Sequence, residues 1–400
     1  TIHPPVLFLG YAALTVPFAI ALAAVARRDR DGWVRPALPW VALAAATLAA
    51  GIVLGAVWAY EVLGWGGYWG WDPVENGSLV PWLATVGLLH GLRVQRATGG
   101  LGRANPVLAV TGYVLVVYAS FLTRSGVLAD FSVHSFADEG LTGFLLAFLA
   151  VVALAGYGTL LARPGGPPRS APRAGGAPRG TVILLGLLVL VALCALVTVG
   201  MSAPLILRAL GRAGSVQPDY YNRVSGPLAI LLCLLLGLAP PSRWGRQTAR
   251  GLLRPSLVPL ALAAGLTGAL AAAGMRDGLQ AGVVFAAAFA LAANAVAAVR
   301  GLHGGWRAAP AALGHAGVAL FLIGVVVSSA FGRSAGVVLP PGEEREVLGY
   351  RLTYEGMRPG PDGRDRAHVV VAGPDGRFTA TPALYWSEHV RGFMRSPHVE

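Results

Sequence analysis

Residues 61–82 read Glu-Val-Leu-Gly-Trp-Gly-Gly-Tyr-Trp-Gly-Trp-Asp-Pro-Val-Glu-Asn-Gly-Ser-Leu-Val-Pro-Trp and lie between two apolar runs of helix length. This tryptophan-rich loop holds four of the ten tryptophans of the chain, Trp65, Trp69, Trp71 and Trp82. One or two tryptophans in such a place are typical of the aromatic belt at a membrane interface. Three within seven residues, separated by glycines that let a planar ligand approach the backbone, instead favour a docking surface for a large, flat, partly charged molecule.

The composition indicates a membrane protein. Hydrophobic residues make up 55% of the 400 residues and charged residues 12%, about half the charged share of a soluble domain, and the mean hydropathy is +0.62. A formal net charge of +12 would suggest a nucleic-acid partner in a soluble protein. Here every cation is an arginine, and most arginines stand in short clusters between apolar runs. We therefore interpret them as topology determinants, and expect membrane lipid and no nucleic acid as a partner.

Ten apolar segments have the length of about 20 residues that is needed to cross a bilayer. They fall at 4–26, 37–60, 79–97, 105–123, 141–162, 181–200, 224–240, 255–274, 279–299 and 309–330. After residue 331 the chain carries charges of both signs, short alternating strands and Pro-Asp-Gly turns. The sequence predicts an all-α polytopic membrane protein with about ten transmembrane helices, followed by a small extracytoplasmic β-rich domain.

The placement of arginine predicts the orientation. If the ten segments alternate, the arginine-rich connections all fall on one side, which the positive-inside rule assigns to the cytoplasm. These arginines are Arg27, Arg28, Arg30, Arg35, Arg93, Arg96, Arg103, Arg163, Arg169, Arg173, Arg179, Arg243, Arg246, Arg250, Arg254, Arg300 and Arg307. The tryptophan-rich loop, an outer histidine loop at 124–140, residues 201–223 and the tail then face outwards. Arg208, Arg212 and Arg223 lie on the outer side and do not follow the pattern.

Two histidines are expected beside the tryptophan-rich loop. His3 stands at the outer end of the first segment, and His134 lies in the outer histidine loop. Either one alone is more simply an interfacial histidine that forms hydrogen bonds, because intermediate burial is ordinary for this residue. Together, beside an aromatic platform, they favour axial nitrogen ligands for a haem iron. The chain has no Cys-x-x-Cys-His, so it does not itself carry covalently attached haem.

His90 and His315 lie inside apolar segments. His90 is roughly 16 Å below the outer face and His315 roughly 9 Å above the inner face, at 1.5 Å per residue, so both lie at a similar depth in a core ~30 Å thick. An intramembrane ionisable residue indicates function by default, and two at one depth predict a bis-histidine haem b. The alternative is that each is a neutral histidine bonded to a backbone carbonyl. Gly314 and Gly317 flank His315 and leave room for a flat macrocycle.

The stretch 65–76, Trp-Gly-Gly-Tyr-Trp-Gly-Trp-Asp-Pro-Val-Glu-Asn, resembles the tryptophan-rich WWD signature of membrane haem-handling proteins. With its continuation Gly-Ser-Leu-Val-Pro-Trp-Leu it is most similar to the CcmF family, the haem lyase subunit of bacterial cytochrome c maturation. The family has Trp where Tyr68 stands and a bulkier residue at Gly70. The four histidines described above also resemble the family's histidines, so the resemblance runs from His3 to His315 and is weak through 163–300.

The resemblance implies a haem lyase of the bacterial inner membrane. Haem would arrive on the outer side from a haem chaperone of the CcmE type, lie against Trp65, Trp69 and Trp71, and be held by His3 and His134. Its vinyl groups would add to the Cys-x-x-Cys-His thiols of apocytochrome c, which subunits of the CcmH and CcmI type would present. The buried haem b would keep the working iron ferrous, with quinol as a candidate electron donor.

Further residues have candidate roles under the same resemblance. Asp72 and Glu75 are candidates for orienting the motif, although Asp72-Pro73 is also a helix-start signal. Arg124 is a candidate partner for a haem propionate, since arginine suits planar carboxylate recognition.

The predicted regions are a haem-handling transmembrane core at 1–162, a cytoplasmic linker at 163–180, a second transmembrane bundle at 181–330 and the extracytoplasmic domain at 331–400. Because the chain begins without Met and enters an apolar run almost at once, we expect a fragment of a longer protein. Two other classes remain open: a haem or lipid-linked transporter with the tryptophan-rich loop as its gate, and a respiratory cytochrome b that needs only the buried pair. A lyase dedicated to one unusual cytochrome is a third alternative.

Overall fold

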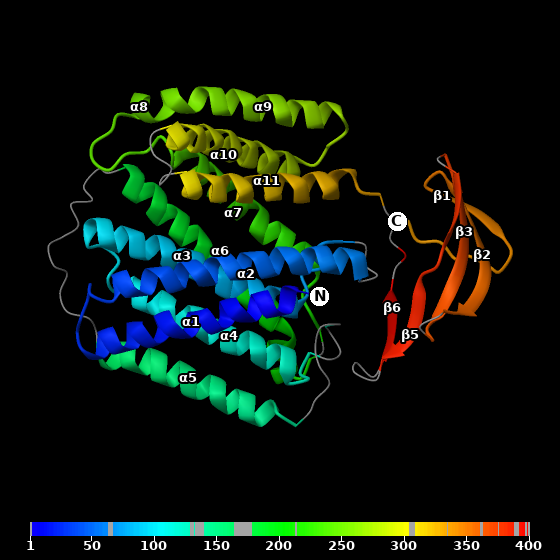
Figure 1. Ribbon diagram of the computed structural model, residues 1–400, viewed down its shortest axis with the longest axis horizontal. Helices are drawn as coiled ribbons and strands as arrows, with labels where there is room; N and C mark the ends of the chain where they lie inside the picture. Colours follow the sequence, from blue (N-terminus) through cyan, green and yellow to red (C-terminus); the bar gives the residue numbers. More distant parts are fainter. Residues whose placement is uncertain are drawn as a thin grey trace.

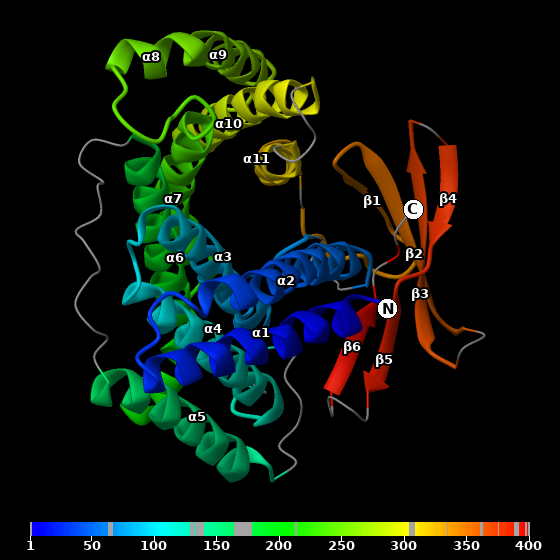
Figure 2. The ribbon, with the colours of Figure 1, turned by 60° about the vertical axis from the view of Figure 1, so that its left-hand side comes forward.

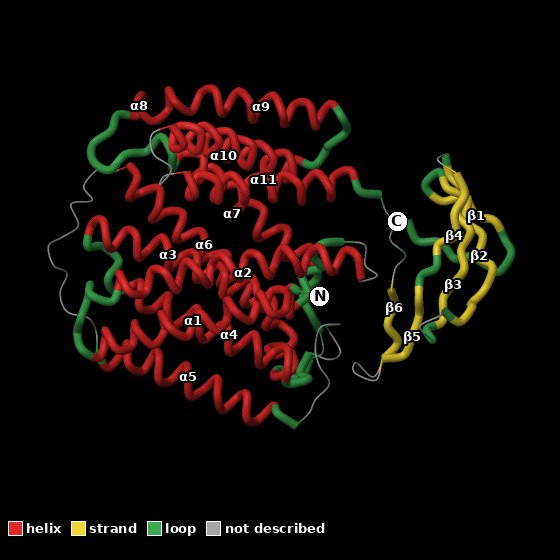
Figure 3. Tube along the Cα trace, viewed as in Figure 1, coloured by secondary structure: helices red, strands yellow, loops and turns green. Residues whose placement is uncertain are grey.

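The computed structural model describes residues 2–62, 67–128, 132, 140–163, 178–212, 214–303, 309–333, 335–360, 363–374, 376–387, 392–396 and 398. Within them the chain forms a bundle of long helices with a small antiparallel sheet at one end (Figures 1 and 3). This arrangement confirms the predicted class, a helical membrane bundle followed by a β-rich tail.

The helices are α1 (His3–Ala26), α2 (Val34–Val62), α3 (Pro73–Thr98), α4 (Ala104–Arg124), α5 (Thr142–Ala162), α6 (Pro178–Ala209), α7 (Pro218–Leu238), α8 (Ala249–Leu253), α9 (Leu257–Ala272), α10 (Gly278–His303) and α11 (Ala309–Phe331), with a 3-10 turn η1 (Arg254–Ser256) between α8 and α9. In the described part of the chain, nine helical stretches are long and apolar enough to cross a membrane, with α8, η1 and α9 counted as one. The remaining predicted segment corresponds to α3, which is more polar.

Its position in the bundle explains the polarity of α3. The helix packs against α2, α4 and α6, and its buried side chains include Asn76, Ser78, Thr85 and Gln95. A helix enclosed by other helices can carry such groups when they are hydrogen-bonded internally. The Thr85 hydroxyl, for example, donates to the carbonyl of Pro81 at 2.6 Å. A hydropathy threshold alone therefore does not identify α3 as a membrane helix, although α3 begins at the tryptophan-rich loop and carries His90.

The helices form two groups that meet at α7. In the first group α1 packs on α2, α3 on α4 and α6, and α5 on α4; in the second, α9 and α11 both pack on α10, and α7 joins the groups through α10. The principal packing partner of α11 is α10, and in Figure 2 it stands apart from α2 and α3. Its fully buried residues are small, Ala309, Ala312 and Ala319. Most of the surface of α11 is thus open to lipid or to a ligand.

The sheet contains β1 (Glu344–Val347), β2 (Tyr350–Pro359), β3 (Asp365–Gly373), β4 (Gly376–Ala380), β5 (Ala383–Ser387) and β6 (Gly392–Ser396). The strand order is β1-β2-β3-β5-β6, with β4 also paired to β3, and all pairs are antiparallel. The hairpin from β3 to β4 pairs Gly373 with Gly376, where the sequence predicts a Pro-Asp-Gly turn.

The two ends of the bundle differ in character. The start of α1, the end of α11 and the sheet lie at one end, whereas α8 and the turn between α1 and α2 lie at the other (Figure 1). The second end also holds the C-terminus of α3, because the Gln95 amide donates to the carbonyl of Arg30 at 2.7 Å. Among the described residues, the arginine-rich connections after α1, α3 and α7 therefore lie at one end, as alternation of the segments predicts, and the start of α3 and the sheet lie at the opposite end.

Candidate functional site

Trp71 anchors the tryptophan-rich loop to the bundle. Its backbone is left-handed, with φ of 56°, which is unfavourable for a bulky residue and persists only where the surroundings fix it. Its indole Nε1 donates to Oδ1 of Asn222 at 2.9 Å, and its carbonyl accepts from Nδ2 of Asn76 at 3.0 Å. Its ring stacks on Tyr221, with centroids 4.9 Å apart and planes 4° apart. The start of α7 thus holds one tryptophan of the loop in a defined orientation.

The other described rings of the loop extend this surface. Trp69 meets Trp71 nearly at a right angle, with centroids 6.3 Å apart and planes 89° apart. Tyr68 stacks on Tyr60 of α2 at 4.4 Å and 8°, and both tyrosines are exposed. Because Tyr221 covers one face of Trp71, flat ligands have access to the loop only through the remaining ring faces. Trp65, the third predicted platform residue, lies outside the described residues.

Asp72 and Glu75 form a capping box at the start of α3. The Asp72 carboxylate accepts from the Val74 N–H at 2.8 Å, and the Glu75 carboxylate accepts from the N–H of Gly70 at 2.9 Å and of Asp72 at 3.2 Å. These bonds satisfy amide groups that have no partner within the helix. The interpretation of Asp72-Pro73 as a helix start is therefore confirmed, and the side chains of Asp72 and Glu75 both stabilise the start of α3.

The Asp72 carboxylate also connects two loops. The hydroxyl of Ser132 donates to Oδ1 of Asp72 at 2.8 Å. Ser132 belongs to the outer histidine loop, two residues before His134, which itself lies outside the described residues. Asp72 thus ties the segment next to His134 to the tryptophan-rich loop. Arg124, the last residue of α4, is exposed at the start of this histidine loop.

Replacement of Asp72 by alanine should lower the free energy of unfolding by about 1 kcal/mol, because α3 loses its N-cap. The thermal unfolding midpoint of the detergent-purified protein measures this loss. Asn is as good an N-cap as Asp, so Asp72→Asn should melt close to wild type and serves as the matched control. Loss of function in Asp72→Asn at an unchanged midpoint would contradict the structural role and indicate direct chemistry of the carboxylate.

Close helix packing places His3 against α2. Its ring lies 5.3 Å from that of Trp58, with planes 39° apart. Gly51 and Gly55 of α2 lie at this contact. A Cβ built on Gly55 would lie 3.5 Å from the ring of His3, and a Cβ built on Gly51 would lie 2.9 Å from the Cα of Leu7, one helical turn further along α1. This Gly-x-x-x-Gly pair lets the two backbones approach closely. The position of His3 therefore depends on two glycines that carry no chemistry themselves.

The second candidate site lies inside the bundle. The rings of His90 on α3 and His315 on α11 are neighbours, with centroids 6.0 Å apart and planes 18° apart. Nδ1 of His90 lies 2.8 Å from the carbonyl of Val86, so the hydrogen bond that fixes the ring uses Nδ1 and leaves Nε2 for a ligand. The structure thus brings together the two histidines whose depths agree in the sequence; their role as ligands stays a prediction.

The spacing fits two axial ligands of one iron. With a metal–imidazole bond of about 2.0 Å, as in zinc sites, each ring centre lies about 3 Å from the metal, and two opposed rings lie about 6 Å apart. The observed centroid distance is 6.0 Å. A Cβ on Gly314 or Gly317 would meet nothing within 4 Å, so the flanks of His315 are open, as expected. A bis-histidine haem b is compatible with these residues.

Several residues of the site have no clear signal in the sequence. Tyr221 and Asn222 belong to the segment Asp-Tyr-Tyr-Asn, whose aromatic and polar character on the expected outer side is the one available hint. Trp58 lies inside an apolar segment and Ser132 inside a polar loop, so neither position stands out. Their importance comes from contacts between distant parts of the chain.

The sequence and the fold resemble those of known proteins. Residues 1–128 match the family model described as cytochrome C assembly protein. The cytochrome c-type biogenesis protein CcmF of Pseudomonas aeruginosa is 36% identical, covering 95% of this chain and 60% of that protein. CcmF of Escherichia coli is 32% identical, covering 94% of this chain and 59% of that protein. A solved structure named cytochrome c heme lyase CcmF has a TM-score of 0.76 and 29% identity over 98% of this chain and 63% of that one.

These findings define a multi-pass membrane protein whose listed relatives are named as proteins of cytochrome c-type biogenesis. Over 94–95% of its length the chain is similar to CcmF proteins, which confirms the resemblance drawn from the tryptophan-rich loop and the four histidines. The chain spans about 60% of the length of the curated relatives it matches.

Proposed function

We propose that this chain is the haem-handling part of a haem lyase, which attaches the two vinyl groups of haem to the Cys-x-x-Cys-His thiols of apocytochrome c. In each attachment a thiol S–H adds across a vinyl C=C bond, so that a thioether forms and no leaving group is released. The observation that carries the proposal is the anchored tryptophan surface: Trp71 is fixed by Tyr221 and Asn222, and the loop before His134 is bonded to Asp72 of the same motif.

The residues on the outer side bind and orient the substrate haem. Trp69, together with Trp65 and Trp71, supplies flat apolar surface for the porphyrin. His3 and His134 supply axial nitrogens to its iron. Arg124 receives a propionate, because its planar guanidinium suits a carboxylate. Once haem is held in this way, the vinyl groups are presented to the thiols in a fixed geometry, which is the protein's contribution to the rate.

The buried pair serves a different purpose. His90 and His315 hold a haem b, and the Val86 carbonyl fixes the tautomer and the orientation of His90. When bound there, haem b supplies one-electron transfer, which keeps the iron of the substrate haem ferrous. Quinol is the proposed electron donor. Two histidines holding this haem would favour electron transfer as the chemistry that it supplies.

The proposed setting is the bacterial inner membrane, with the arginine-rich end of the bundle in the cytoplasm. The tryptophan-rich loop and the sheet then lie on the extracytoplasmic side, where c-type cytochromes mature. A haem chaperone of the CcmE type delivers haem there, and subunits of the CcmH and CcmI type present the unfolded apocytochrome.

Cytochrome c assembly in cells tests the proposal. In a strain that lacks its own lyase, the full-length protein containing this chain should restore covalently haem-bound cytochrome c, and His3→Ala should reduce the yield to about one tenth or less, as expected for loss of an iron ligand. The matched control is His368→Ala, on β3, which should assemble like wild type. Full assembly in His3→Ala, or haem export without covalent attachment by the wild type, would contradict the lyase function.

A further inference from the structure

A pocket of about 340 Å³ lies at the arginine-rich end of the bundle, about 9 Å along α3 from His90 at 1.5 Å per residue. Its lining comes from the start of α2 and the end of α3, and consists of Asp31, Val34, Arg35, Gln95, Arg96 and Gly99. Arg35 is the second residue of α2, and Arg96 lies two residues before the end of α3. If α2 and α3 both cross the membrane, as the sequence predicts, the pocket lies at the level where the hydrocarbon meets the headgroups.

A buried polar network gives the pocket a rigid floor. The Gln95 side chain, 3% exposed, donates to the carbonyl of Arg30 at 2.7 Å and to the Asp31 carboxylate at 3.0 Å, and accepts from the Asn105 amide at 2.7 Å. A Cβ on Gly91 would collide with Asn105, so that position has no space for a side chain. The network joins the turn after α1, the end of α3 and the start of α4, and thereby fixes the spacing of the helices that carry Arg35 and Arg96.

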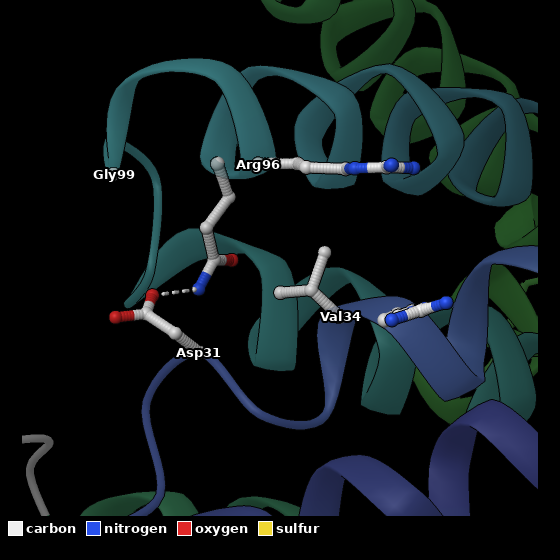
Figure 4. A pocket seen from close by; sticks show the side chains of 6 residues that line it. Asp31, Val34, Arg96 and Gly99 are labelled. Carbon is white, nitrogen blue, oxygen red and sulfur yellow. Dashed lines mark hydrogen bonds between the residues drawn. The ribbon is translucent and has the colours of Figure 1, made fainter.

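The charges of the pocket are arranged for an anion. In the described part of the chain, no carboxylate forms an ion pair with Arg35 or Arg96, and both side chains are exposed. The Asp31 carboxylate is bound to Gln95 at one end of the pocket, while the Arg96 side chain points away from it toward the other end (Figure 4). Two guanidinium groups on neighbouring helices suit the tetrahedral oxygens of a phosphate.

An apolar surface continues from the pocket into the membrane. Below Arg35, the exposed face of α2 carries Ala42, Leu43, Ala46 and Ala50, of which Leu43 is 39% exposed. Val34 contributes an apolar wall to the pocket itself. A molecule with a phosphate group and hydrocarbon chains would therefore find a complementary surface for each part, whereas a free phosphate would use the arginines alone.

We propose that this pocket binds a membrane phospholipid, with its phosphate held between Arg35 and Arg96 and its acyl chains along the exposed face of α2. Basic pockets between transmembrane helices on the cytoplasmic side recognise anionic headgroups in this way. Phosphatidylglycerol, which carries a net negative charge, binds more tightly than phosphatidylcholine. The bound lipid fills the space between α2 and α3. Further along, α2 carries Trp58, which contacts His3, and α3 carries the ligand candidate His90.

Native mass spectrometry of the full-length protein in detergent, titrated with phosphatidylglycerol, tests this site. The wild type should retain the lipid, and the double variant Arg35→Gln, Arg96→Gln should bind it about thirtyfold more weakly, as expected for loss of two cations at a membrane surface. The matched control is Arg243→Gln, Arg246→Gln, which removes the same charge from exposed positions at the same end. Its affinity should stay within about twofold of wild type.

Three results would overturn the proposal. Equal lipid affinity in the variant Arg35→Gln, Arg96→Gln and in the wild type would show that the two arginines do not bind the lipid. An equal loss in the Arg243, Arg246 control would indicate general attraction to a basic surface rather than a site. Displacement of the lipid by millimolar inorganic phosphate would assign the pocket to a soluble anion. If the glutamine variant does not fold, Arg35→Lys, Arg96→Lys keeps both charges, and its binding should be intermediate because lysine lacks the planar fork.

Discussion

Alanine at His90 or His315 should remove haem b from the purified protein. The reason is geometric: ring centroids 6.0 Å apart match two axial ligands of one iron, and loss of one leaves a single nitrogen bond to hold the cofactor. Changes to metal-site residues outside the ligand set cost about 10- to 100-fold in affinity, and loss of a ligand costs more. We therefore expect haem, counted per chain by the pyridine haemochromogen spectrum, to fall below about one tenth of the wild-type content, with loss of the low-spin reduced spectrum.

A control keeps this result specific. His368→Ala changes a histidine of the sheet and should leave both the haem count and the spectrum unchanged. His90→Met offers a second measurement, since methionine is itself an axial ligand that raises the potential of haem. That variant should retain haem but shift its midpoint potential upward. Full haem content with an unshifted spectrum in both His90→Ala and His315→Ala would mean that the pair is not a ligand set, and would favour the reading in which each histidine merely bonds a carbonyl.

Leucine at Gly51 should disrupt the outer site without touching a ligand. A Cβ at this position would lie 2.9 Å from the Cα of Leu7 and 3.0 Å from its backbone nitrogen, so α1 and α2 must move apart. Overpacking of this kind costs about 1–3 kcal/mol. The displacement carries His3 away from Trp58. We expect a thermal midpoint several degrees lower and cytochrome c assembly reduced by about tenfold or more, while haem b between α3 and α11 is retained.

The neighbouring residue provides the matched control for this prediction. Ala50 lies on the exposed face of α2, so Ala50→Leu adds the same side chain to the same turn without meeting α1. It should melt and assemble like wild type. Assembly at the wild-type level in Gly51→Leu, with an intact midpoint, would show that the outer site tolerates movement of His3 and would count against its role as an iron ligand.

Features that depend on local pattern could be predicted from the sequence. The apolar lengths predict the helices, the Pro-Asp-Gly turns predict the hairpins, and a count of residues along two segments places His90 and His315 at one depth. The length of each apolar segment and the thickness of the hydrocarbon core determine the membrane helices and the depth of their residues, and neither quantity requires the tertiary structure.

Features that depend on long-range contact could not be predicted. Trp71 is expected to be a free platform ring, yet Tyr221, from a helix far along the chain, covers one of its faces. The sequence leaves the task of Asp72 open between helix start and motif orientation, and its bond to Ser132 shows that it also joins two loops. The regular spacing of Gly51 and Gly55 is visible, but its consequence for His3 requires the position of α1. Such contacts depend on how helices pack, which no local pattern specifies.

A haem held by His90 and His315 would have a second task in the assembly of the bundle. This helix rests mainly on α10, while its histidine faces α3 in the other helix group. An iron bonded to both histidines would cross-link the two helix groups. Because the haem would bind only the folded protein, its binding would raise the free energy of unfolding. Haem insertion would then be a step in the protein's own assembly, and a cell short of haem would accumulate a protein in which α11 has yet to dock against α3.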